Sequence, residues 1–140
     1  MEAMSWQVKK IKVLLKASGL PYMREKKFRG LVNDNKTTLS MDFAVKINNR
    51  YCCIEFNGRH HYFPIGDSER AMKRLIRFRH NGDCRKEWAK ANKVPLLIIP
   101  FDAEKQIAEI VHDYMADCWK DLNELPYVRQ YAKNSYGIFF

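Results

Sequence analysis

Residues 39–57 read LSMDFAVKINNRYCCIEFN, and this stretch predicts a tight β-hairpin. Its first nine residues alternate, which places one apolar set on a single side of a strand: Leu39, Met41, Phe43, Val45 and Ile47. Residues 51–56 form the expected partner strand. The pair Asn48-Asn49 between them tolerates the positive φ angles that two-residue hairpin turns require.

A two-residue turn determines which residues face each other across the hairpin. The expected pairs are Ile47 with Arg50, Val45 with Cys52, and Phe43 with Ile54. Asp42 then lies opposite Glu55, with Cβ atoms about 4.5–5.5 Å apart, a spacing at which like charges destabilise the sheet. A divalent cation held by oxygen ligands would offset this repulsion.

The two acids could instead lie on a solvated face of the sheet, where they would tolerate each other in water. The surroundings of Glu55 favour the cation, because this residue stands between Ile54 and Phe56 in an apolar run. An acid within a largely buried strand usually has a partner or a chemical task. We therefore treat Asp42 and Glu55 as a candidate metal site.

The length and composition of the chain predict one globular domain with an ordinary hydrophobic core. The chain has 140 residues, of which 46% are hydrophobic and 13% aromatic, and we expect a core at about 5–120. The tail at 121–140 is expected to dock on that core because of its rings: Tyr127, Tyr131, Tyr136, Phe139 and Phe140. No apolar run reaches about 18 residues, and no signal-peptide pattern is present, so we expect no membrane partner and a cytoplasmic protein (the host cytoplasm if a phage encodes it).

The four cysteines, Cys52, Cys53, Cys84 and Cys118, have no CxxC spacing and are predicted to be free thiols. Cys52 and Cys53 are adjacent in a strand and point to opposite faces, so they cannot share one site. A zinc centre that combines one of them with His60 or His61 remains an alternative.

Positive charge is concentrated in one segment. The formal net charge is +9, and residues 70–93 carry nine Lys or Arg against two acids, whereas residues 102–124 carry seven acids against two Lys. Such a one-sided basic field is typical of proteins that bind a polyanion, most often nucleic acid. A solvated helix face would give the same pattern.

The remaining elements complete an α/β fold. Residues 5–18 read as an amphipathic helix that Gly19 ends, and residues 22–30 as an edge strand. Residues 95–101 are continuously apolar, which is typical of a strand covered on both faces. A helix follows from residue 103. Together with the hairpin, these elements predict a mixed sheet flanked by helices.

The segment between the hairpin and the buried strand is expected to hold two helices. Asp67 or Ser68 can cap the first, whose inward-facing residues would be Met72, Leu75 and Ile76. Asn81-Gly82 is expected to break it. Asp83 would then cap a second helix that ends near residue 92.

Four segments resemble the PD-(D/E)XK nuclease superfamily: MDF at 41–43, IEFNGRHHY at 54–62, DCRKEW at 83–88 and VPLLIIPF at 94–101. The acid-x-Asn-Gly-x-x-His string that begins at Glu55 is similar to the branch of very-short-patch repair and phage homing endonucleases. The likeness covers about residues 7–101. It implies a restriction-endonuclease-like core of helix, strand meander, helix, strand and helix.

The resemblance also implies roles for individual residues. Asp42 resembles the metal-binding aspartate, Glu55 the second acid and His61 the histidine of the branch, while Asp83 and Lys86 resemble a polar pair on the following helix. Two positions depart from the family pattern. The superfamily's lysine is replaced by Asn57, so Arg59, His61 or Lys86 would have to supply its charge; the first-helix glutamate is replaced by Gln7, with Glu25 as a substitute.

The chemistry of phosphodiester hydrolysis gives these residues a task. Mg²⁺ or Mn²⁺ would be held by Asp42 and Glu55, with the Phe56 carbonyl as a further ligand. His61, with an ordinary pKa of about 6.5, could transfer the proton, although His60 and His61 could also simply hydrogen-bond their loop. Lys86 or Arg59 would stabilise the phosphate. The cations expected on the nucleic-acid backbone are Arg59, Arg74, Arg77, Arg79, Arg85 and Lys86.

The sequence therefore predicts a Mg²⁺-dependent endodeoxyribonuclease that acts on double-stranded or branched DNA, with a homodimer as one assembly. Three alternatives stay open. The first is a non-catalytic nucleic-acid-binding module of the same fold, which Asn57 favours. The others are an RNase and a nuclease specific for DNA junctions.

Overall fold

The computed structural model describes residues 5–103, 106–120, 128–131 and 138–139. Along the chain its elements are α1 (Trp6–Ser18), β1 (Tyr22–Val32), β2 (Thr38–Ile47), β3 (Arg50–Asn57), the 3₁₀ turn η1 (Arg59–His61), α2 (Glu69–Asn92), β4 (Leu96–Pro100), α3 (Ile107–Cys118), β5 (Val128–Tyr131) and β6 (Ile138–Phe139). The strands form one mixed sheet in the order β1-β2-β3-β4-β5-β6. The predicted α/β class is confirmed.

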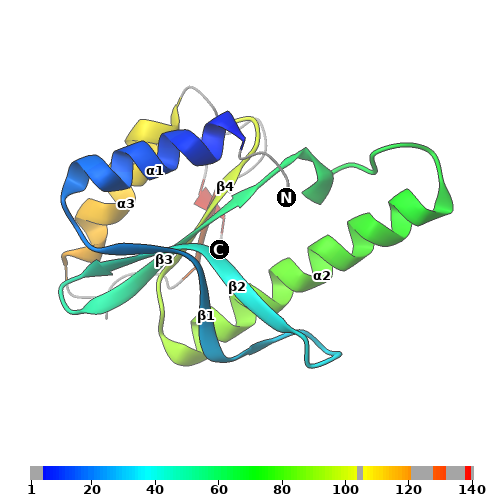
Figure 1. Cartoon of the computed structure of the whole chain (residues 1–140), viewed down its shortest axis with the longest axis horizontal. Coiled ribbons are helices and arrows are strands. Elements are labelled where there is room, and N and C mark those ends of the chain that lie inside the picture. The colour runs from blue at the N-terminus through cyan, green and yellow to red at the C-terminus, as the bar shows by residue number, and fades with distance from the viewer. Residues whose placement is uncertain (1–4, 104–105, 121–127, 132–137, 140) are drawn as a thin grey trace.

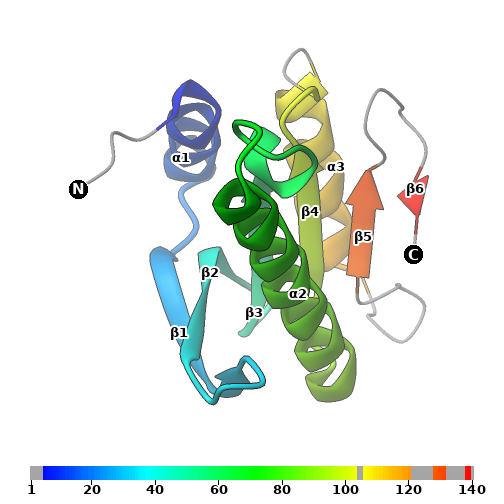
Figure 2. The same cartoon turned by 90° about the vertical axis from the view of Figure 1, so that its right-hand side faces the viewer.

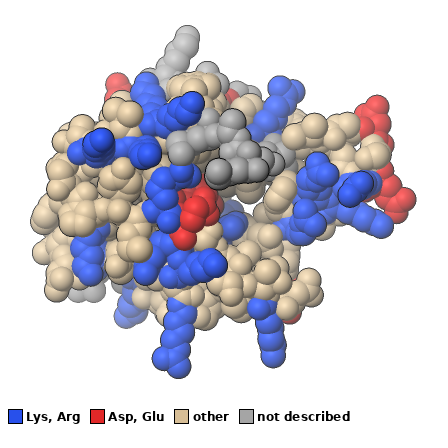
Figure 3. Space-filling model, in the orientation of Figure 1, with Lys and Arg blue, Asp and Glu red and all other residues tan. Residues whose placement is uncertain are grey.

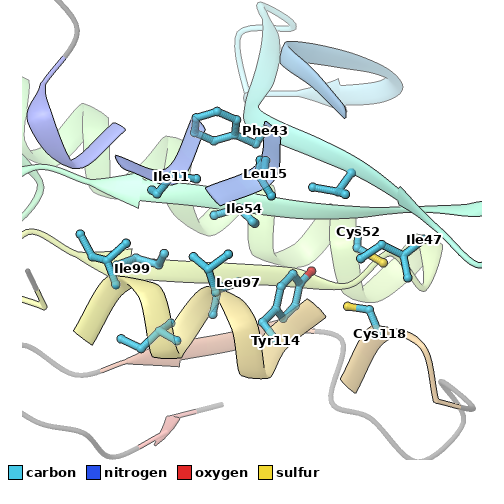
Figure 4. Close-up of a cluster of buried hydrophobic side chains, with 14 of the residues drawn as sticks. Ile11, Leu15, Phe43, Ile47, Cys52, Ile54, Leu97, Ile99, Tyr114 and Cys118 are labelled. Atoms are coloured by element: carbon cyan, nitrogen blue, oxygen red, sulfur yellow. The ribbon is translucent and has the colours of Figure 1, made fainter. Parts of the chain in front are cut away.

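Helices cover both faces of this sheet. Figures 1 and 2 show α1 and α3 on one face and α2 crossing the other. Figure 4 shows the apolar cluster beneath α1 and α3, where Ile54 and Leu97 meet the helices. Every residue of β4 is buried, as predicted for residues 95–101, because Leu97 and Ile99 face that cluster while Leu96 and Ile98 face α2. Each such side chain contributes about 1.5–3 kcal/mol through burial.

The hairpin register is confirmed. β2 and β3 pair antiparallel, with Ile47 opposite Arg50, Val45 opposite Cys52 and Phe43 opposite Ile54. Asn48 and Asn49 have φ angles of 52° and 66°, as a two-residue turn of this twist requires. Local turn chemistry therefore sets the alignment that carries Asp42 towards Glu55.

The prediction that five alternating residues of β2 share one side is wrong. Phe43, Val45 and Ile47 do pack beneath α1 and α3, but Leu39 and Met41 pack on the α2 side. The alternation changes phase at Asp42, and β1 changes at the same level, where Glu25 has a φ of 50°. Figure 1 shows β1 and β2 turning sharply, so that the far end of their hairpin wraps towards α2.

The two helices predicted in residues 67–92 are one. α2 begins after Ser68, whose side-chain oxygen accepts the Ala71 N–H at 3.1 Å, and continues through Asn81-Gly82 to a left-handed cap at Lys93. A glycine inside a helix costs only about 1 kcal/mol relative to alanine, and neighbouring residues of high helix propensity can offset that cost. Asp83 therefore lies within a helix and caps nothing.

The first half of α2 projects beyond the sheet (Figure 1). Leu75 is buried as predicted, at 6% exposure, but Met72 and Ile76 are 47% and 61% exposed. The inward orientation predicted for these two residues is wrong because none of the described strands lies beneath this part of the helix.

The helix expected from residue 103 begins later, at Ile107, as α3. α1 is capped by Ser5 and ended by Gly19, and β1 is an edge strand. Residues 128–131 and 138–139 of the tail join the sheet as β5 and β6, while Tyr127, Tyr136 and Phe140 lie outside the described residues. The four cysteines are free thiols. None of the described helices is long and apolar enough to cross a bilayer.

Candidate active site

Asp42 and Glu55 each bind the backbone of the opposite strand. Glu55 Oε1 accepts the Asp42 N–H at 2.6 Å, and Asp42 Oδ2 accepts the Phe56 N–H at 2.8 Å. The β2–β3 ladder ends one residue earlier, at Phe43 and Ile54. The carboxylates thus replace the next rungs of the ladder, at the point where β2 bends away from β3.

Both carboxylates are held in surroundings that disfavour their charge. Burial raises the pKa of Asp42 from 3.8 to about 6, against the lowering effects of the Phe56 N–H and Arg85. Burial, and then the charge of Asp42, raise the pKa of Glu55 well above 4.5. The amides offset only part of the cost of this pair, and a bound cation would offset more of it.

The Phe56 carbonyl faces the same gap. In an extended strand, the N–H and C=O of one residue point to the same side, and the Phe56 N–H points to Asp42. Strand geometry therefore places the Phe56 carbonyl on the edge of β3 that faces Asp42, where β2 and β3 separate. Oxygen ligands of this kind suit Mg²⁺ and Mn²⁺.

Glu25 is a third acid beside this pair. It lies at the kink of β1, where its charge contributes to raising the pKa of both Asp42 and Glu55. Its Oε2 accepts a hydrogen bond from Ser40 Oγ at 2.7 Å, and its Oε1 lies 3.8 Å from the Arg24 guanidinium. Figure 3 shows an acidic patch bordered by Lys and Arg side chains on the face drawn there. Gln7, the first-helix position named from the sequence, lies on α1.

A cavity of about 240 Å³ extends from Glu55 towards α2 and η1. Seven of the residues that line it are among those named from the sequence: Glu55, Asn57, His61, Arg79, Asp83, Arg85 and Lys86. Asp42 stands at the other side of Glu55 and does not line the cavity. β3 thus places one acid between a carboxylate partner and a cationic cavity.

Lys86 supplies a positive charge to the cavity from α2. It is partly buried, and burial lowers its pKa below 10.5 despite Asp83, whose carboxylate lies 3.9 Å from Nζ. Asn57 of β3 is a neutral residue that lines the same cavity. Among the described residues that line this cavity, the Lys and Arg side chains all come from α2.

His61 lies in the cavity, with its ring 5.4 Å from the Phe78 ring. The backbone of η1 is held against α2 by Arg79, which donates to the carbonyls of His61 at 3.3 Å and Tyr62 at 3.0 Å. The side chain of His60 lies outside what the structure describes. Of the two vicinal histidines, His61 is the one whose side chain is described, and it lines the cavity together with Glu55.

The five arginines predicted on nucleic acid fall into three groups. Arg79 and Arg85 are engaged within the protein, since Arg85 Nε donates to the Ser40 carbonyl at 2.9 Å and lies 3.8 Å from Glu55 Oε2. The prediction missed this positioning role, which depends on contacts between distant elements. Arg74 and Arg77 instead line an open groove on the projecting half of α2, together with Arg70 and Lys73. Arg59 stacks on Phe63, with its guanidinium 5.6 Å from the ring centre.

Two further observations concern the lining of the cavity and the cysteines of β3. Gln130 of β5 lines the cavity, and no sequence signal pointed to it. Cys52 and Cys53 are fully buried in the two apolar clusters on opposite sheet faces, which leaves neither placed to join a zinc centre with His61.

No family model, curated protein or solved structure is significantly similar to this chain. Function must therefore be argued from the site itself.

Proposed function

We propose that this protein is a metal-dependent endonuclease that hydrolyses DNA phosphodiester bonds. The observation that carries the proposal is the pairing of Asp42 with Glu55, two carboxylates of raised pKa beside a cationic cavity. Acids in such surroundings are typical of functional sites. The resemblance of the surrounding segments to the PD-(D/E)XK superfamily points the same way.

Asp42, Glu55 and the Phe56 carbonyl would hold Mg²⁺ or Mn²⁺. The donors fit such an ion because all of them are oxygens. A cation would also offset the free-energy cost of burying the two negative charges, which raises the pKa of both acids. The bound ion supplies a water of lowered pKa and shields the charge of a phosphate oxygen.

Residues of the chain would transfer the proton, stabilise the phosphate and position Glu55. His61 lies in the same cavity as Glu55 and can accept or donate the proton. Lys86 can stabilise the negative charge that develops on the phosphate, in place of the lysine that Asn57 replaces. Arg85 would act as a positioning residue, since it links Glu55 to the Ser40 backbone.

The basic groove on α2 provides an electrostatic surface for the polyanion. Arg70, Lys73, Arg74 and Arg77 line it. Phosphate contacts of this kind give affinity that falls steeply with salt and carry no sequence specificity. The groove fits a polyanion, and the resemblance to the PD-(D/E)XK superfamily makes DNA, double-stranded or branched, the substrate proposed. A homodimer would allow both strands to be cut.

The test is nicking of supercoiled plasmid with Mg²⁺, with Mn²⁺ and with EDTA. We expect activity that requires the metal and is lost in Asp42→Asn and Glu55→Gln, while Asp113→Asn, an exposed carboxylate on α3, keeps it. Cleavage that survives EDTA or either active-site variant would contradict the mechanism. A parallel assay with structured RNA and a four-way junction separates the RNase and junction-nuclease alternatives.

A non-catalytic nucleic-acid-binding module is the second candidate. Its support is that both carboxylates already accept backbone N–H groups, and that Asn57 occupies the usual lysine position. Such a module would bind DNA in a salt-dependent way without cutting any of the substrates above.

A further inference from the structure

A second group of potential metal ligands lies outside the candidate active site. It consists of Asp34, in the turn between β1 and β2, and of His80 and Cys84 on α2. Their ligand atoms all lie within 4.8 Å of one another. His80 Nε2 is 2.8 Å from Asp34 Oδ2 and 3.7 Å from Cys84 Sγ. Nothing in the proposed hydrolysis uses these three side chains.

The helix and the turn position the backbone of all three residues before any ion binds. His80 and Cys84 are four residues apart, so they lie on one face of α2. The turn that carries Asp34 is closed by Asn33, whose side-chain oxygen accepts the N–H groups of Asn35 at 3.0 Å and Thr37 at 2.9 Å. The ligand geometry thus does not depend on a loose loop.

Neighbouring contacts fix the hairpin against α2. Trp88, one turn beyond Cys84, donates its indole N–H to the Arg29 carbonyl at 3.2 Å and packs its ring 4.9 Å from that of Phe28. The hairpin is therefore joined to α2 by contacts besides the one between Asp34 and His80.

We propose that Asp34, His80 and Cys84 form a site for Zn²⁺ or a similar transition-metal ion, which clamps the β1–β2 hairpin onto α2. One carboxylate, one imidazole and one thiolate match the preferences of zinc and not those of Mg²⁺. Zinc bonds of about 2.0–2.3 Å in a tetrahedron place ligand atoms roughly 3.3–3.8 Å apart, so small side-chain shifts suffice.

The charges around the site favour a cation. The carboxylates of Asp34, Glu87 and Asp83 place negative charge around Cys84. A bound metal ion would counter this negative field and stabilise the thiolate. Water or a further group would complete four-coordination.

The clamp would act on the part of α2 that faces the cavity. Asp83, Arg85 and Lys86 stand within two residues of Cys84 and line the cavity. An ion at this site would therefore hold these side chains in place relative to Glu55. The inference does not require the protein to be a nuclease.

The test uses the full chain, freed of metal by chelation and titrated with Co²⁺. We expect a thiolate-to-cobalt charge-transfer band and tetrahedral d–d bands, both displaced by Zn²⁺. Cys84→Ser should remove the charge-transfer band, and His80→Ala should weaken binding, whereas His112→Ala, which removes an exposed histidine on α3, should change nothing.

Controls separate this site from the proposed catalytic one. Asp42→Asn should retain the cobalt spectrum, because it leaves all three ligands intact, and circular dichroism checks that each variant is folded. A wild-type chain without the charge-transfer band, or a Cys84→Ser variant that keeps it, would overturn the proposal. Zn²⁺ should also raise the unfolding temperature of the wild type but not of Cys84→Ser, and an equal rise in both would equally overturn it.

Discussion

Replacing Asp42 by Asn should stabilise the protein in the absence of metal. Asn keeps the size of the side chain and an oxygen that can accept the Phe56 N–H, but it removes a buried charge beside Glu55. A shift of the Asp42 pKa from 3.8 to about 6 corresponds to about 3 kcal/mol of unfolding free energy, as an upper limit. That is roughly 6–12 °C in unfolding temperature for a domain of this size.

The sign follows from proton linkage. Because the folded-state pKa of Asp42 lies above its unfolded value, the folded protein binds this proton more tightly. The associated stability is fully present below about pH 4 and is lost as the pH rises through about 6. The advantage of Asp42→Asn should therefore be largest at pH 7 and disappear near pH 4.

The assay is urea unfolding in EDTA at pH 7 and pH 4, followed by circular dichroism, with Asp113→Asn as the matched control. Mn²⁺ added at pH 7 should then stabilise the wild type and leave Asp42→Asn unchanged, because a ligand that binds only the folded state raises its stability. An Asp42→Asn variant that is no more stable than the wild type at pH 7 in EDTA would refute the reasoning about the buried pair.

Three further outcomes are expected. Lys86→Met should abolish plasmid nicking while leaving salt-dependent DNA binding nearly intact, and Lys86→Arg should retain part of the activity; equal activity of wild type and Lys86→Met would exclude Lys86 from the reaction. Arg85→Met should raise the pKa of Glu55 further, so half-maximal Mn²⁺ binding, followed by calorimetry, should move to higher pH; an unchanged profile would argue against a charge role for Arg85. Gly82→Ala should stabilise α2 by about 0.5–1 kcal/mol in urea unfolding, since nothing lies within 4 Å of the added Cβ; destabilisation would mean that the helix needs a glycine there.

The hairpin could be predicted because its determinants are local. Asn48-Asn49 fixes the turn, and the turn fixes the register as far as Phe43 and Ile54. The change of phase at Asp42 could not be predicted, since it arises where β1 and β2 bend together and where carboxylates replace ladder hydrogen bonds. A period-two pattern contains no information about such a bend.

The continuity of α2 was missed for a related reason. The sequence cue at Gly82 reports a local propensity of about 1 kcal/mol, which packing of the helix on the sheet and hairpin outweighs. The break predicted at Gly82 makes Asp83 a helix cap. In the structure, Asp83 lies within the helix and lines the cavity, where it faces Lys86.

Only part of the candidate site could be predicted from the sequence. Spacing alone pointed to Asp42 and Glu55, because a short turn between two strands determines which residues lie opposite each other. His61, Asp83 and Lys86 were named through resemblance, and their convergence depends on how α2 lies across the sheet. The internal contacts of Arg79 and Arg85 had no sequence signal at all.

The most direct test of the central claim is a crystal structure of the protein with Mn²⁺, with anomalous data collected to locate the ion. The account predicts a Mn²⁺ ion bound by Asp42, Glu55 and the Phe56 carbonyl, with the hydrogen bonds of both carboxylates to the strand amides loosened or shared. An absence of manganese at this pair, with both carboxylates still closed on the Asp42 and Phe56 N–H groups, would contradict it.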